Sequence, residues 1–345
     1  MPQLSTNENA NGLPARISEC IRILRLPLVL GPVLVHSCLA PRSSPLQYVL
    51  ARIIGDASVP ALFFISGLLY FVTFDGSWAC YRRKLASRVL SLGVPYLFWN
   101  LVCFIVFAYV VNIVARGDFP QAFWGVRVAR RAGATAPVNA PLYYVKDVFL
   151  LALAAPVLHL GLSRKTLAWL SPAALAFWCL SPVAGLASRA IVLGTAFFAF
   201  GGFTAIHGMR LLDAFAVSRK RAFAAMSLFA AVSAAHAALH LAGHDWPGLY
   251  RLNIVCGIPF WFAVAARAGG KAAAILARAG NAAMFLFCTF DIVLVTLRHL
   301  FPFFFGRSDA VCLLSAILTV SASMALFALT AHFAPKTLKV LTGGR

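Results

Sequence analysis

The sequence predicts an all-α, polytopic integral membrane protein. Of its 345 residues, 61% are hydrophobic and only 12% are charged, which is far less charged surface than a soluble domain needs. Apolar runs of about 17 to 25 residues recur from one end of the chain to the other. Because about 20 apolar residues cross a bilayer as one helix, each run is expected to be a transmembrane helix.

About ten helices are expected to span the membrane. Residues 1–20 are polar and show no signal peptide, so we interpret them as a cytoplasmic tail that precedes a retained first span. Residues 21–345 are expected to form a single transmembrane domain, with one long extramembrane loop at 115–141. The predicted spans are 22–41, 57–75, 88–114, 142–160, 166–183, 188–208, 221–242, 251–268, 280–301 and 310–334.

The basic residues lie mostly between the apolar runs, and the formal net charge is +20. This distribution follows the positive-inside rule, so no nucleic-acid partner is expected. With the N-terminus in the cytoplasm, nineteen of the 30 Lys and Arg residues fall on the inner side. We therefore predict cytoplasmic N- and C-termini in a multi-pass protein of a bacterial-type plasma (inner) membrane, with the lipid bilayer as a permanent partner.

The eight cysteines are scattered, mostly within the apolar runs, and form neither a Cys-x-x-Cys motif nor a Cys/His cluster. Cysteines in this pattern are typical of small buried hydrophobic side chains. We therefore expect neither a disulfide framework nor a metal site.

Arg25 and His36 lie in the first predicted span, eleven residues apart. At 100° per residue they share one helix face, about 16 Å apart along the axis. A charge and a titratable imidazole on one face of a membrane helix are costly, which favours a functional role. The structural alternative is an anchoring arginine and a hydrogen-bonded histidine that packs between helices.

Two further segments carry polar residues where the helices could approach a ligand. Lys84 and Arg88 share a helix face at the inner end of the third span. They could be ordinary anchors of the helix or, together with Arg25, form a cluster that suits phosphate groups. Ser66 and Gly67 lie in the second span, where a small-residue pair favours close helix packing and the serine can donate a hydrogen bond.

Carboxylates in or beside the spans are the other candidates. Asp147 lies near the outer end of the fourth span, at the expected depth of His36, and could orient that imidazole or pair with Lys146. Asp291 lies near the middle of the ninth span, where an isolated carboxylate is expensive. Asp56, at the end of a span, is expected to be solvated.

These residues lie in segments that follow one another as in a known family. The segments are Arg25 with ten residues before His36, FFISGLLYF (63–71), KLASRVLSLGVPYLFWN (84–100), PLYYVKDVFLLALAAP (141–156), FFAFGG (197–202) and PKTLKVLTGGR (335–345). Through them the chain resembles the membrane-bound acyltransferase-3 family, in particular its stand-alone sugar O-acetylase branch. Where many relatives have a histidine late in the ninth helix, this chain has Phe290 and Asp291.

The resemblance implies transfer of an acyl group, usually acetyl, from cytosolic acyl-CoA (acetyl-CoA) to a sugar hydroxyl at the outer face. The acceptor would be a glycan or a lipid-linked sugar, and no permanently bound cofactor is expected. His36 would deprotonate the hydroxyl or relay the acyl group covalently, and the sequence does not choose between these routes. The predicted roles are catalysis for His36 and Asp147, donor binding for Arg25, Lys84, Arg88 and Ser66, and substrate binding for Tyr144, Lys146 and Asp291.

Two other classes of function fit the same composition. A transporter would also have about ten spans, buried charges and a basic inner side, although no pair of matching broken half-helices suggests inverted repeats. A structural subunit of a polysaccharide export system would leave Arg25 and His36 dispensable. Acyl transfer from labelled acetyl-CoA by the purified protein would separate the three.

Overall fold

The computed structural model describes residues 12–38, 44–115, 137–181, 190–306 and 308–344. Within these ranges, every element of regular secondary structure is a helix. The elements are α1 (Ala15–Ser37), α2 (Pro45–Tyr48), η1 (Val49–Gly55), α3 (Ser58–Phe71), α4 (Trp78–Arg88), η2 (Val89–Gly93), α5 (Val94–Ala115), η3 (Ala140–Leu142), α8 (Tyr143–Ser163), α9 (Lys165–Ala168), α10 (Leu170–Leu180), α11 (Ala190–Phe203), η4 (Thr204–Gly208), α12 (Met209–Val217), α13 (Arg219–Leu241), α14 (Pro247–Ala265), α15 (Gly270–Ala279), η5 (Gly280–Ala282), α16 (Ala283–Phe305), α17 (Asp309–Phe333) and α18 (Pro335–Leu341).

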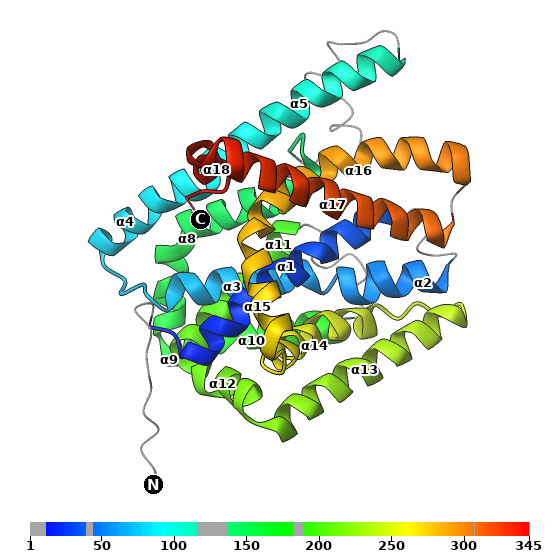
Figure 1. The fold of residues 1–345 in the computed structure, drawn as a ribbon. Helices are drawn as coiled ribbons and strands as arrows, with labels where there is room; N and C mark the ends of the chain where they lie inside the picture. Colours follow the sequence, from blue (N-terminus) through cyan, green and yellow to red (C-terminus); the bar gives the residue numbers. More distant parts are fainter. Residues whose placement is uncertain (1–11, 39–43, 116–136, 182–189, 307, 345) are drawn as a thin grey trace.

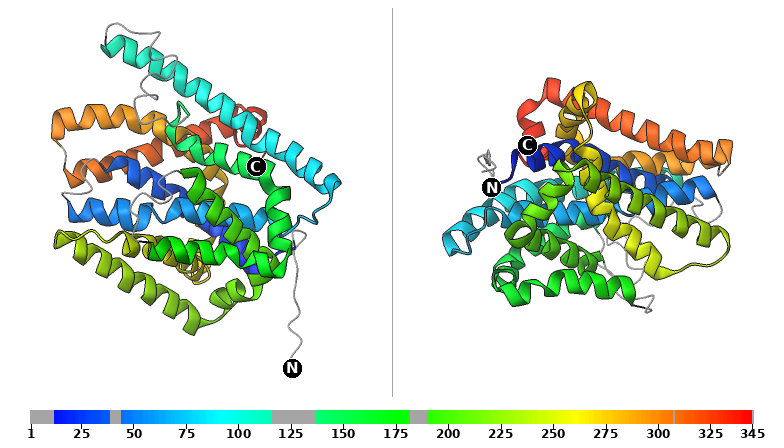
Figure 2. Two further views of the ribbon diagram at one scale, coloured as in Figure 1. Left: turned by 180° about the vertical axis from the view of Figure 1, so that it is seen from behind. Right: turned by 90° about the horizontal axis from the view of Figure 1, so that it is seen from below.

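Eight segments of the described chain are long and apolar enough to cross a membrane, which confirms the all-α, polytopic fold class. In Figure 1 most of their long helices run from side to side, with α5 and α13 rising and α17 falling toward the right. The start of α1 and the short α18 lie on the same side of the bundle (Figures 1 and 2). The eight segments are Pro45–Phe71, Trp78–Val106, Ala140–Ser163, Ile191–Val217, Arg219–Leu241, Pro247–Ala265, Gly270–Leu297 and Asp309–Phe333.

Two of the predicted spans are not among these eight. The segment 166–183 is divided between α9 and α10, and the eleven residues of α10 cover only about 16 Å, roughly half of the hydrocarbon core. The first predicted span, 22–41, corresponds to α1, which begins at Ala15 within the predicted tail and carries four charged residues in its first half.

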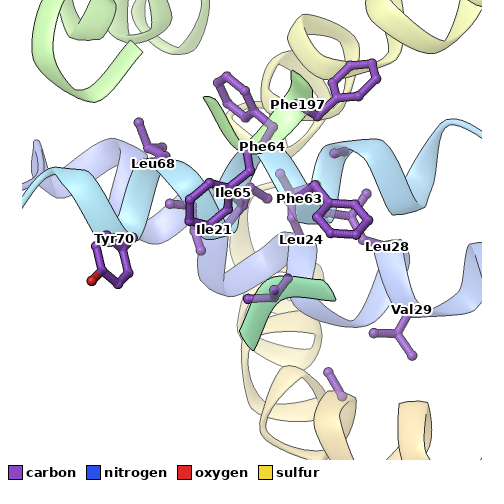
Figure 3. Close-up of a cluster of buried hydrophobic side chains, with 14 of the residues drawn as sticks. Ile21, Leu24, Leu28, Val29, Phe63, Phe64, Ile65, Leu68, Tyr70 and Phe197 are labelled. Carbon is purple, nitrogen blue, oxygen red and sulfur yellow. The ribbon is translucent and has the colours of Figure 1, made fainter. Parts of the chain in front are cut away.

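α1 lies in the middle of the bundle, where it contacts α3, α14, α15, α16 and α17 (Figure 1). Its apolar side chains are buried against those of α3. Figure 3 shows Leu24 and Leu28 beside Phe63, and Phe64 beside Phe197 of α11. α1 therefore buries its apolar side chains in the protein core, while Arg25 and His36 on it are half-buried.

Glycines allow α3 and α11 to pack backbone to backbone. A Cβ on Gly67 would overlap the carbonyl oxygen of Phe198, and a Cβ on Gly201 would overlap that of Phe64. The small-residue pair Ser66-Gly67 therefore packs closely, as predicted, and its partner is the FFAFGG segment (197–202).

Three π-helical segments, η1, η2 and η4, interrupt otherwise continuous spans. Such segments rotate the following residues relative to a regular α-helix and are frequent at functional sites. η1 ends at Gly55, directly before Asp56, and η2 begins directly after Arg88. Two of the three thus adjoin charged residues that bear on the site.

Candidate active site

A cavity of about 230 Å³ lies in the centre of the bundle, between α1, η1–α3, the start of α8, α11, α14 and α16. Most of its lining is apolar and includes two phenylalanine rings, Phe63 and Phe287. The groups on its wall that can exchange protons are His36, Asp56, Tyr143 and Tyr250. A concave, mainly apolar cavity with a few convergent polar groups is the usual form of a small-molecule site.

His36 is the imidazole of this cavity and reaches it from the last turn of α1. Its Nδ1 lies 4.0 Å from Oδ1 of Asp291 on α16, and its ring meets Phe290 edge-on with 5.8 Å between ring centres. The His36 side chain is 31% exposed and that of Asp291 is 8% exposed. Phe290 and Asp291, where the sequence departs from the pattern of the family, thus lie directly against His36. Hydropathy alone could not show that contact.

The position of His36 depends on a close approach between α1 and η1. A Cβ on Gly31 would overlap the side chain of Ser58 and lie 3.1 Å from the carbonyl oxygen of Gly55. A Cβ on Gly55 would lie 2.5 Å from Cγ2 of Val35. Because both positions are glycine, the helix that carries His36 and the segment that carries Asp56 share one cavity.

Asp56 is largely removed from solvent, which corrects the expectation that it is solvated. Its side chain is 15% exposed, and its Oδ2 accepts hydrogen bonds from Nη1 of Arg52 at 3.1 Å and from the Tyr250 hydroxyl at 2.9 Å. The expectation failed because the second predicted span began at residue 57, whereas the helix begins at Pro45. The four-residue spacing of Arg52 and Asp56 was the available signal, since it pairs opposite charges along a helix.

Asp147 pairs with its neighbour. Its Oδ1 lies 3.6 Å from Nζ of Lys146, and its side chain is 3% exposed. The structure describes no contact between Asp147 and His36, whose nearby carboxylate is Asp291. The pairing with Lys146 was the structural alternative for Asp147, so a catalytic role for this residue stays a prediction.

Ser66 and Tyr144, predicted for different substrates, lie together. The Ser66 and Tyr144 hydroxyl oxygens are 2.8 Å apart, and the Tyr144 hydroxyl also donates to the carbonyl oxygen of Leu62 at 3.3 Å. The ring of Tyr144 packs against Phe63 and Phe287, which line the cavity. This pair therefore supports the cavity wall from behind and joins α3 to α8.

The three cations predicted to bind the donor, Arg25, Lys84 and Arg88, lie at two separate places. Lys84 Nζ donates to the carbonyl oxygen of Tyr70 at 2.9 Å and to Oγ1 of Thr73 at 2.5 Å, and it lies over the Tyr70 ring. Arg88 is close enough to Lys84 and Tyr70 to interact electrostatically with both. Arg25 packs against Gly280 of η5, and no described contact joins it to the other two cations.

The described residues contain no group of three or more His, Cys, Asp or Glu side chains that could hold a metal ion. One cysteine pair is close: Sγ of Cys38, at the end of α1, lies 2.8 Å from Sγ of Cys312 on α17. This contact joins two helices that meet near the end of α1.

Comparison with known proteins identifies the family of the chain. A family model described as an acyltransferase domain matches residues 19–330. The chain is also similar to the succinoglycan biosynthesis protein ExoH of Rhizobium meliloti (strain 1021), at 28% identity over 96% of this chain and 94% of that protein. No solved structure matches the chain. The family model covers most of the chain, including His36, Asp56 and Asp291, and the protein therefore belongs to the acyltransferase-3 family.

Proposed function

We propose that the protein is a membrane O-acyltransferase that moves an acyl group, acetyl in the simplest case, from cytosolic acyl-CoA to a sugar hydroxyl of a cell-surface or exported glycan. The observation that carries the proposal is His36 in a central cavity with Asp291 beside it. The family membership supports acyl transfer, and the name of the Rhizobium relative supports a polysaccharide acceptor.

The position of Asp291 defines how His36 would act. A carboxylate beside Nδ1 favours the tautomer with its proton on Nδ1, which leaves the basic lone pair on Nε2. In the direct route, Nε2 takes the proton of the sugar hydroxyl as its oxygen attacks the thioester carbonyl, and the CoA thiolate leaves and is protonated. The imidazolium that forms is stabilised by the Asp291 carboxylate.

In the covalent route, Nε2 itself attacks the thioester carbonyl and CoA leaves as its thiolate. The sugar hydroxyl then attacks the acyl group, the bond from that group to Nε2 breaks, and the hydroxyl proton goes to the released thiolate. Both routes use the same nitrogen and the same carboxylate. Rapid quenching of the protein with labelled acetyl-CoA and no acceptor separates them, because only the covalent route leaves label on His36.

The cationic residues on the inner halves of the helices are proposed to bind the donor. Arg88 and Lys84 lie together near the end of α3, and their charges suit the phosphates of CoA. Arg25 lies on the same helix face as His36, about 16 Å along α1, and would line the path between the phosphates and the thioester. This arrangement requires cytoplasmic termini and placement in the plasma membrane, which we propose together with it.

The test uses purified full-length protein in lipid nanodiscs. The donor is acetyl-CoA labelled in the acetyl group, and the acceptor is surface polysaccharide from cells that lack this gene. We expect label to appear on the polysaccharide with the wild-type protein and not with His36→Ala. The matched control is His332→Ala, which changes an exposed histidine at the end of α17. Transfer by His36→Ala at the wild-type rate, or no transfer by the wild-type protein, would refute the proposal.

A further inference from the structure

We propose that Asp56, held in place by Arg52 and Tyr250, binds a hydroxyl group of the sugar acceptor in the cavity that contains His36. This inference rests on the proposed function and adds an acceptor-binding residue to it. The family resemblance assigned no role to Asp56, Arg52 or Tyr250, and the case for them comes from the geometry of the cavity.

The two oxygens of Asp56 have different surroundings. Oδ2 accepts both described hydrogen bonds, from Arg52 Nη1 at 3.1 Å and from the Tyr250 hydroxyl at 2.9 Å. Within the described residues, no hydrogen bond is made to Oδ1, and the residue lines the cavity. A mostly buried carboxylate with an unused oxygen at a cavity wall can accept a hydrogen bond from a ligand.

The Asp56 carboxylate is also oriented for this contact before a ligand binds. Arg52 and Tyr250 approach from η1 and α14, so two separate elements determine where the Asp56 oxygens point. A hydrogen bond from a hydroxyl to an ionised carboxylate is about twice as strong as one between neutral groups. Because the group is already oriented, little of that free energy is lost in ordering the side chain.

The rest of the cavity suits a neutral sugar and not the phosphate groups of the donor. No lysine or arginine is among the described residues that line it, so phosphates would find no counter-charge there and would be repelled by Asp56. Its volume of about 230 Å³ is below the roughly 300–1,000 Å³ of sites that hold drug-sized ligands, so it is too small for a whole CoA. The rings of Phe63 and Phe287 offer apolar faces to the C–H groups of a sugar.

The experiment measures binding directly, without relying on acyl transfer. Surface polysaccharide from cells that lack this gene is cleaved to fluorescent oligosaccharides, and their binding to full-length protein in nanodiscs is measured beside the binding of CoA. We expect Asp56→Asn to weaken oligosaccharide binding by about tenfold or more, as for a lost charge-assisted hydrogen bond, with CoA binding unchanged. The matched control is Asp245→Asn, which changes a largely exposed carboxylate paired with His240 outside the cavity.

A second variant keeps the test decisive if Asp56→Asn does not fold. Tyr250→Phe removes one donor to Asp56 but keeps the ring, and we expect it to weaken oligosaccharide binding by about threefold to tenfold. Unchanged oligosaccharide binding in both variants, or loss of CoA binding instead, overturns the inference. So does a wild-type protein that binds no oligosaccharide. A wild-type protein that binds oligosaccharide but transfers no acetyl group refutes the proposed function and leaves the acceptor site standing.

Discussion

The close approach of α1 to η1 can be tested by adding one methyl group. In Gly31→Ala the new Cβ overlaps the Ser58 side chain and lies 3.1 Å from the carbonyl oxygen of Gly55. To restore normal contacts, α1 and the η1–α3 segment must move apart by about 1 Å. That movement separates His36 from Asp56, which line one cavity from these two elements.

The expected free energies follow from this geometry. Overpacking costs about 1–3 kcal/mol, and alanine in a helix regains up to about 1 kcal/mol relative to glycine. We therefore expect a net loss of about 1–2 kcal/mol in stability, measured as a lower Tm of the purified protein. Acyl transfer should fall by about 100-fold, since a displacement of about 1 Å at a reacting group has that effect.

A second substitution makes the reasoning refutable. Ser58→Gly removes the side-chain atoms that Gly31→Ala would meet, so the double variant should recover most of the lost Tm and activity. Gly161→Ala is the control, because a Cβ there has no neighbour within 4 Å and should leave activity unchanged while raising stability by about 0.5–1 kcal/mol. If Gly31→Ala has the wild-type Tm and activity, the close approach is not what positions His36.

Three further predictions use the same assays. Gly67→Ala should lower the Tm more than Gly31→Ala does, because its Cβ meets backbone of α11 that cannot rotate away; an unchanged Tm would contradict the packing of α3 on α11. Asp291→Asn should lower kcat at least tenfold with little change in oligosaccharide or CoA binding, and equal losses in binding would assign it to a substrate site. Arg88→Gln should weaken CoA binding by about 1–3 kcal/mol, less so at high salt; unchanged affinity would leave Arg88 as an anchor.

The fold class and part of the site could be predicted from the sequence because they depend on local patterns. The apolar runs define the spans, and the eleven-residue spacing puts Arg25 and His36 on one helix face. The small-residue pair at Ser66 and Gly67 indicated close helix packing. In each case the signal lies within one helix, where the geometry of the α-helix converts spacing into direction.

The contacts between helices were harder to predict because most spans are apolar all round. Such a helix has no polar face from which its rotation about its own axis can be inferred. The contact of His36 with Asp291 joins residues 255 positions apart, and nothing local to either one indicates the other. Asp56 was missed for a different reason, since the π-helical η1 continues a span beyond the apolar run that predicted it.

The presence of His36 and Asp291 within membrane spans is easier to explain for the pair than for either residue alone. A carboxylate near the middle of a membrane span is expensive unless a partner stabilises its charge, and here an imidazole lies 4.0 Å away. An imidazole in the same place gains a defined tautomer from the carboxylate and a neighbour that stabilises its cation. Under the proposed function, Asp291 on α16 would therefore orient the imidazole of α1. Because Gly31 and Gly55 allow α1 to approach η1 closely, the same cavity brings this imidazole and Asp56 together, and the proposed chemistry uses both.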